Sequence, residues 1–127
     1  MSATVLGLGV DLVDVAELRQ LLTASDGAFV ETAWTPKELA QCAQQSSRLA
    51  ACWAAKEAAM KALGLGIGDI DPLDVEVDMD DQLHLLVHLS GPAETARIDR
   101  GITSLVVRVA RDQQWAIATA IATGPGR

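Results

Sequence analysis

Residues 53–62 read WAAKEAAMKA, a composition that predicts an α-helix because alanine is the strongest helix former. Glu57 and Lys61 are one turn apart on this helix and share a face, with Trp53 one turn before them. A carboxylate and an ammonium at this spacing form an ordinary helix salt bridge, worth about 0.2–0.5 kcal/mol, and this is the simplest interpretation of the pair. A role of Glu57 and Lys61 in catalysis or binding is indicated only together with a second segment, residues 7–11, which read GLGVD.

The size and composition of the chain predict one globular domain over residues 1–127. Half of the residues are apolar and about a fifth are charged, which is typical of a folded protein. No apolar run is long enough to span a bilayer and no signal segment is expected at the start, so we predict no membrane partner. Cys42 and Cys52 lack the spacing of metal ligands and are expected to be a reduced pair in a cytoplasmic protein.

The formal net charge of −7 argues against a nucleic-acid partner, because such proteins need a basic surface. It does not exclude an anionic small molecule, since a local basic group or a divalent cation reverses the sign of the charge locally. We therefore expect no nucleic-acid partner.

The hydrophobic pattern predicts an α+β domain, with helices in the first half and mostly antiparallel strands in the second. The predicted strands are 4–13, 73–78, 83–89, 103–111 and 114–122, and the predicted helices are 14–25, 36–45, 46–63 and 90–100. Thr35 and Glu38 have the spacing of a capping box at the start of the second helix. Ser46 or Ser47 is expected to cap the third helix, and Gly64 to end it in the left-handed conformation.

These segments resemble those of the 4′-phosphopantetheinyl transferase superfamily, and the chain length narrows the resemblance to the small holo-acyl-carrier-protein synthase type. The resemblance covers nearly the whole chain and rests on Gly9-Val10-Asp11, on the Trp-x-x-Lys-Glu-Ala motif at 53–58 and on the glycine-rich loop at 64–68. The Gly-x-Asp segment alone is a weak signal, whereas the helix motif followed by this loop is specific. The resemblance implies the transferase fold, in which a long helix packs on a mostly antiparallel sheet.

The resemblance also implies an enzyme that transfers 4′-phosphopantetheine from coenzyme A to a carrier-protein serine and releases 3′,5′-ADP. Catalysis of such a transfer is mainly positioning and neutralisation of charge, for which Mg²⁺ held by one or two carboxylates is suited. The implied metal ligands are Asp11 and Glu57, and Lys61 would place its charge on the pyrophosphate. Glu57, or a water that it orients, would accept the serine proton. Asp14 is expected to cap the first helix, and Trp53 to pack in the core.

The resemblance implies contacts to coenzyme A from Lys56, Gly64, Gly66 and Gly68, and Arg111, in place of a family histidine, is expected to supply a further one. Glycines let the backbone approach the nucleotide closely, although a simple helix end also explains Gly64. Lys56 belongs to the helix motif, and a solvated surface lysine is the alternative there. Because small members of the family assemble as trimers with the coenzyme site at subunit interfaces, the resemblance implies a homotrimer.

Several residues depart from the family pattern at positions that bind the partner or the coenzyme. Glu17 and Thr32 stand where arginines are common, so the expected carrier is an acyl carrier protein other than the strongly acidic fatty-acid type. Cys52 also replaces an arginine, and Ala110 and Arg111 replace a Ser-His pair. These departures leave open an alternative, a catalytically impaired member that acts as a carrier-protein-binding or subunit partner.

Overall fold

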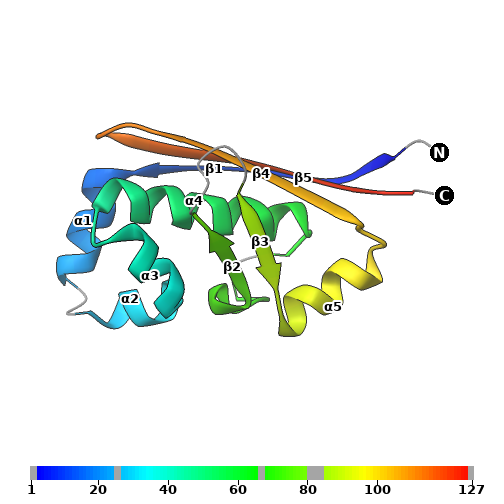
Figure 1. The fold of residues 1–127 in the computed structure, drawn as a ribbon, viewed down its shortest axis with the longest axis horizontal. Helices are drawn as coiled ribbons and strands as arrows, with labels where there is room; N and C mark the ends of the chain where they lie inside the picture. The colour runs from blue at the N-terminus through cyan, green and yellow to red at the C-terminus, as the bar shows by residue number, and fades with distance from the viewer. Residues whose placement is uncertain (1–2, 25–26, 66–67, 80–84, 126–127) are drawn as a thin grey trace.

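The computed structural model describes residues 3–24, 27–65, 68–79 and 85–125, and its central element is the helix α4 (Ser46–Ala62). In this part of the chain the strands form a three-stranded and a two-stranded sheet, and α4 lies between them (Figure 1). The larger sheet has the order β1 (Thr4–Asp14), β5 (Trp115–Gly124), β4 (Ser104–Arg111). The smaller sheet pairs β2 (Val75–Asp78) with β3 (Leu86–Leu89). All of these pairings are antiparallel, so the predicted α+β class is confirmed.

The other helices lie near the two ends of α4 (Figure 1). Those at its N-terminal end are α1 (Val15–Ala24), α2 (Ala28–Ala33) and α3 (Pro36–Cys42), and α5 (Gly91–Asp99) lies toward its C-terminal end. Within the described residues, no helix combines the length and the apolar character that crossing a membrane requires.

Some predicted boundaries differ from the structure. The helix α3 ends at Cys42 rather than near residue 45 because Ala43 adopts the left-handed conformation with a φ of 50°. The prediction lacks α2, whose six residues are too few to show a helical period. A 3₁₀ turn, Pro72–Asp74, takes the place of the first residues of the strand predicted over 73–78. Of the strand predicted over 83–89, residues 83 and 84 lie outside the described residues, and β3 begins at Leu86.

The predicted N-terminal caps of α1 and α3 are present, whereas the predicted cap of α4 is not. The Asp14 carboxylate accepts hydrogen bonds from the first amides of α1, and Thr35 and Glu38 form a reciprocal capping box on α3. The expected cap of α4 by Ser46 or Ser47 is wrong, because both serines are already inside the helix and the N-cap residue before them makes no side-chain bond. Their hydroxyls accept hydrogen bonds from arginine side chains instead.

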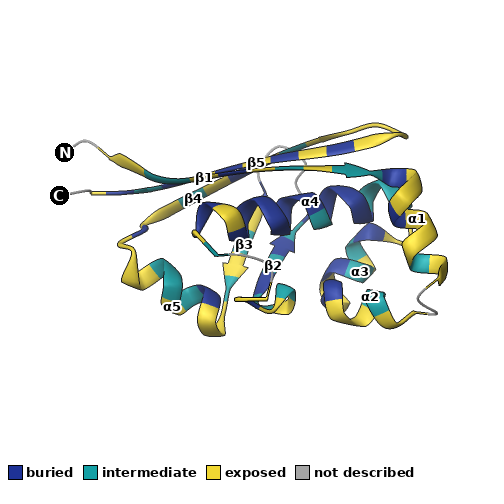
Figure 2. Ribbon diagram, turned by 180° about the vertical axis from the view of Figure 1, so that it is seen from behind, coloured by how far each residue is buried: buried dark blue, intermediate teal, exposed yellow. Residues whose placement is uncertain are grey.

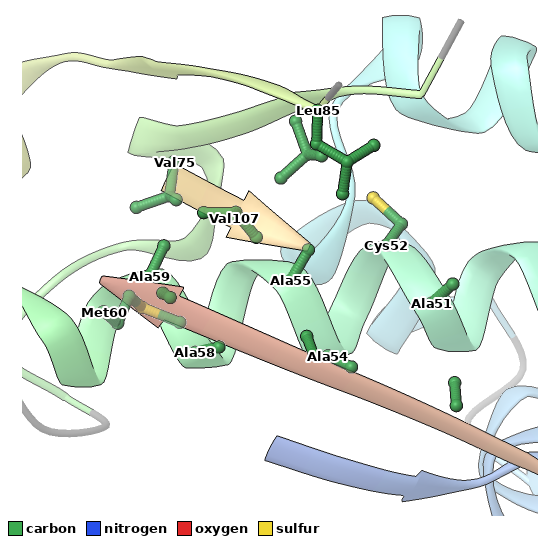
Figure 3. Close-up of a cluster of buried hydrophobic side chains, with 14 of the residues drawn as sticks. Ala51, Cys52, Ala54, Ala55, Ala58, Ala59, Met60, Val75, Leu85 and Val107 are labelled. Carbon is green, nitrogen blue, oxygen red and sulfur yellow. The ribbon is translucent and has the colours of Figure 1, made fainter. Parts of the chain in front are cut away.

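The helix α4 is buried on nearly all sides, which explains why so much of its sequence is alanine (Figure 2). Figure 3 shows alanines on opposite sides of α4: Ala55 and Ala59 point to the side of Val75, Val107 and Leu85, whereas Ala54 and Ala58 point the other way. Small side chains on both sides let the two sheets approach the helix axis closely while the interior stays well packed.

Two glycines of β1 bring that strand into contact with the backbone of α4. A Cβ atom at Gly7 would overlap the carbonyl oxygen of Ala62, and a Cβ atom at Gly9 would overlap that of Ala58. Only glycine fits at these positions. Because alternate residues of a strand point to the same side, Asp11 faces α4 as Gly9 does. The glycines of the GLGVD segment therefore place the aspartate against the C-terminal half of the helix.

The face of the larger sheet that points away from α4 is apolar and exposed. Along β5 exposed and buried residues alternate, and the buried ones face α4. The strand register places Leu8 beside Ile121 and Leu12 beside Ile117, so the exposed side chains form continuous rows. We call this set, with Val10, the outer sheet face.

Candidate functional site

The aspartate of β1 and the second lysine of the helix motif are in direct contact. Lys61 Nζ lies 3.2 Å from Asp11 Oδ1 and also donates a hydrogen bond to the Val10 carbonyl at 3.0 Å. The Lys61 side chain is half exposed, whereas that of Asp11 is 18% exposed. The ammonium is therefore accessible to a ligand although it is hydrogen-bonded, while the carboxylate is held by the packing of β1 on α4.

Glu57 lies one turn before Lys61 on α4 and lines the same cleft as Asp11. It is only 6% exposed. Burial raises the pKa of Glu57, and the nearby Asp11 carboxylate raises it further. The Lys61 ammonium lowers this pKa, but its effect is smaller. Two neighbouring carboxylates in a partly buried cleft, one of which disfavours the charge of the other, are suited to bind a cation.

The donor set fits Mg²⁺ better than a metal that needs a full protein cage. No group of three or more His, Cys, Asp or Glu side chains among the described residues could hold a metal ion. Mg²⁺ is commonly bound by one or two carboxylates, with water and substrate phosphate completing its shell. Asp11 and Glu57 satisfy this requirement.

The cleft beside these carboxylates has an acidic side and an apolar side. Its volume is about 320 Å³, and its acidic side chains are Asp11, Asp14, Glu17 and Glu57. The apolar lining is Leu12, Val13, Leu18, Leu21, Phe29 and Trp53. Phe29 and Trp53 are 5.5 Å apart between ring centroids and belong to an aromatic cluster with Trp34. Trp53 therefore packs in this cluster and also lines the cleft.

Lys56 does not lie in the cleft, and its placement disagrees with the predicted contact to coenzyme A. Its side chain is fully buried, and its Nζ lies 2.6 Å from Glu38 Oε1. The Glu38 carboxylate also accepts hydrogen bonds from the Thr35 amide and from the Val77 amide, each at 2.8 Å. The ion pair thus joins α3, α4 and β2, and the ammonium is not available to a ligand. The capping box indicated Glu38, but nothing in the sequence indicated this partner.

The predicted glycine loop begins close to Lys61 and is only partly described. Gly64 ends α4 with a φ of 77°, as expected, and its carbonyl accepts a hydrogen bond from Arg100 at 3.4 Å. Gly68 also has a positive φ, 98°, and is exposed. Both conformations favour glycine. Gly66 lies outside the described residues.

Arg111 lies at the other end of α4 from Lys61. Its Nη1 donates a hydrogen bond to Ser47 Oγ at 2.9 Å, in the first turn of the helix. Within one chain the structure therefore brings together Asp11, Glu57 and Lys61, with Gly64 next along the chain, but not Arg111.

A model of the 4′-phosphopantetheinyl transferase superfamily matches residues 7–120, which include all three of these side chains. The chain belongs to this superfamily. A holo-acyl-carrier-protein synthase of Syntrophus aciditrophicus is 36% identical over 122 residues, which cover 93% of this chain and 95% of that relative. The Helicobacter pylori synthase in complex with coenzyme A is 29% identical, with a TM-score of 0.80, over 91% of this chain and 98% of that one. A Plasmodium yoelii acyl carrier protein synthase with ADP bound, 24% identical, has a similar fold with a TM-score of 0.87, over 99% of this chain and 100% of that one.

The predicted superfamily and fold are confirmed, and so is the enzyme class, a 4′-phosphopantetheinyl transferase. The matched region contains the whole acidic cleft and the complete α4 helix. The roles of the individual side chains of this transferase remain predictions.

Proposed function

We propose that this transferase moves 4′-phosphopantetheine from coenzyme A to a serine of an acyl or peptidyl carrier protein in a Mg²⁺-dependent reaction. The observation that carries the proposal is the convergence of Asp11, Glu57 and Lys61 beside one cleft. The alternative of an impaired partner protein has less support, because all three side chains are in place. The cytoplasmic location remains a prediction from the sequence.

In this proposal Asp11 and Glu57 would hold the metal ion, and the ion would supply positive charge to neutralise the pyrophosphate. Lys61 releases Asp11 and donates to a pyrophosphate oxygen, since its ammonium is half exposed. The serine oxygen forms a bond to the phosphorus that carries the pantetheine, and the bond to the nucleotide phosphate breaks, which releases 3′,5′-ADP. Glu57, or a water that it orients, takes the serine proton, and its raised pKa makes it the stronger base.

The carrier in this proposal is not a strongly acidic one. Glu17 is exposed in the first turn of α1 and lines the cleft in which the serine has to arrive. Thr32 on α2 is also exposed, and its hydroxyl donates to the Phe29 carbonyl rather than offering a positive charge. An acidic docking helix would meet repulsion here, whereas a neutral or basic segment would not.

We also propose a homotrimer, which the outer sheet face supports. In one chain Leu8 is 65% exposed, Leu12 58% and Ile117 41%. A continuous apolar face of this kind is typical of a surface that is covered by another protein surface. Sedimentation at micromolar concentration tests this: a trimer that Leu12→Asp dissociates would support it, and a stable monomer would contradict it.

The activity itself is tested by incubating the purified protein with apo-carrier proteins, coenzyme A and Mg²⁺, and measuring the mass of each carrier. We expect at least one carrier to gain a phosphopantetheine group, and we expect a chelator to prevent the gain. Neutral and acidic carriers are compared in the same assay. The proposal fails if every carrier stays in the apo form while an active synthase modifies the same preparations.

A further inference from the structure

The two cysteines of the chain face each other between α3 and α4. Cys42 is the last residue of α3, and Cys52 lies in the second turn of α4. Both side chains are fully buried and both are free thiols, and the Cys52 thiol donates a hydrogen bond to the Cys42 sulfur. We call these two residues the thiol pair. The proposed transfer reaction assigns no role to either of them.

The packing of α3 on α4 holds the thiols opposite each other. Lys56 Nζ of α4 lies 2.6 Å from Glu38 Oε1 of α3, and both side chains are fully buried. Glu38 comes four residues before Cys42, so the two share the buried face of α3. On α4 the order is reversed, because Cys52 comes four residues before Lys56. The ion pair and the thiol pair are therefore neighbouring contacts, one turn apart, between helices that run in opposite directions.

The turn that follows Cys42 has a strained backbone and lies beside a cavity. Ala43 and Gln44 have φ values of 50° and 62°, and among the described residues they are the two non-glycine residues with a positive φ. Side chains disfavour this conformation. The cavity has a volume of about 510 Å³, and its lining includes Ala40, Gln44 and Leu49. A strained turn beside a cavity opens locally at low cost, so a small reagent can approach the end of α3 from this side.

The surroundings of the thiol pair favour the reactive form of one thiol. The hydrogen bond from Cys52 lowers the pKa of Cys42, and the positive charges of Arg48 and Arg111 lower it further. Burial and the Glu38 charge raise this pKa, but their effects are outweighed. The same hydrogen bond, followed by burial, raises the pKa of Cys52, which therefore keeps its proton. Since the thiolate is the nucleophile in thiol oxidation, Cys42 is the first of the two to react.

We propose that the thiol pair is a redox site, at which a peroxide converts the two thiols into a disulfide that joins α3 to α4. The Cys42 thiolate attacks one peroxide oxygen, so that an S–O bond forms, the O–O bond breaks, and the departing hydroxide takes up the proton that Cys42 had lost. The Cys52 sulfur then attacks the Cys42 sulfur, which forms the S–S bond and breaks the S–O bond. The Cys52 proton leaves with this second hydroxide as water. The two thiols together lose two electrons, and the peroxide gains them.

The test treats the folded protein with a small excess of hydrogen peroxide and measures its free thiols and its intact mass under non-reducing conditions. We expect both thiols to disappear together, with the loss of two hydrogen atoms and no added oxygen, and dithiothreitol to restore them. The disulfide should raise the melting temperature by on the order of 5–10 °C, because it restricts the unfolded chain. Cys42→Ala and Cys52→Ala are the matched controls, and neither should gain stability from peroxide. Cys52→Ala keeps the attacking thiol and should stop at the addition of oxygen.

The proposal is overturned if the folded wild type keeps both thiols at a peroxide concentration that oxidises the urea-unfolded chain. It is also overturned if oxidation joins two chains, or adds oxygen to the wild type instead of removing hydrogen. Each alanine variant replaces a buried thiol with the small apolar side chain that α4 already carries at most of its buried positions, and circular dichroism verifies that the variants fold. The measurements do not involve transfer activity, so a failure of the proposed function leaves their outcome unchanged.

Discussion

Lys61 Nζ lies 3.2 Å from Asp11 Oδ1, so the cationic and anionic groups of the proposed site neutralise each other across the contact between α4 and β1. A metal ion that binds Asp11 competes with this ammonium, and a pyrophosphate that binds Lys61 competes with this carboxylate. A bound metal ion therefore frees the Lys61 ammonium for the pyrophosphate, and a bound pyrophosphate frees the Asp11 carboxylate for the metal ion. This exchange of partners predicts that Mg²⁺ and coenzyme A strengthen each other's binding.

We expect Asp11→Asn to reduce transfer by roughly a hundredfold or more, because the site loses one of its two metal carboxylates. Kinetics as a function of Mg²⁺ concentration is the measurement, and the amide should shift the dependence to higher Mg²⁺ as well as lower the rate. Asp99→Asn on α5, far from the cleft, is the control for the loss of one negative charge. Comparable activity in Asp11→Asn would refute the two-carboxylate site.

Glu57→Gln is expected to abolish transfer and yet to stabilise the metal-free protein at neutral pH. Burial, followed by the Asp11 charge, raises the pKa of Glu57 above its value in the unfolded chain. The folded state therefore binds this proton more tightly, and the resulting stability is present at low pH and is lost as the pH rises through the folded-state pKa. The amide avoids that loss, since it carries no charge to be desolvated.

Calorimetric unfolding with a chelator present measures this effect. The melting temperature of Glu57→Gln should exceed that of the wild type by on the order of a few degrees near pH 7, and the difference should vanish at about pH 4. Added Mg²⁺ should stabilise the wild type and not the variant. Glu31→Gln, an exposed glutamate of α2, should show neither behaviour.

Features set by neighbouring residues could be predicted from the sequence. The capping box of Thr35 and Glu38 needs only residues three apart, and Gly64 ends α4 through its own backbone conformation. The pairing of Glu57 with Lys61 on one side of a helix also follows from local spacing. The placement of Asp11 beside them required the family resemblance, because it depends on a contact between distant segments.

Features set by tertiary packing could not be predicted in this way. Since α4 is buried on nearly all sides, its sequence has no amphipathic stripe to show which face holds Lys56 and which holds Glu57. The reason for Gly7 and Gly9 is a clash with the backbone of α4, which is visible only in the folded chain. The hydrogen bonds of Arg19 and Arg111 to the first turn of α4 likewise join α1, α4 and β4, whose approach no sequence spacing indicates.

Lys56→Met is expected to lower stability rather than coenzyme affinity. It leaves the fully buried Glu38 carboxylate without its cation, and breaking a buried ion pair costs about 3–5 kcal/mol. Urea unfolding measures the loss. Lys37→Met is the matched control, because Lys37 pairs with Asp78 at 3.7 Å but is 49% exposed, and its loss should cost at most about 1 kcal/mol. A weaker affinity for coenzyme A with unchanged stability would instead restore the coenzyme contact predicted from the motif.

Glu17→Arg is expected to shift the carrier preference toward acidic carriers. The Glu17 side chain is exposed on the cleft side of α1. The charge reversal replaces repulsion of an acidic docking segment by attraction. We therefore expect roughly a tenfold rise in kcat/KM with an acidic carrier. The gain should shrink as salt is added, since exposed charges are screened. Asp99→Arg makes a similar reversal on α5, none of whose described residues lines the cleft, and should change neither carrier. Equal gains with acidic and neutral carriers would show that Glu17 does not select the partner.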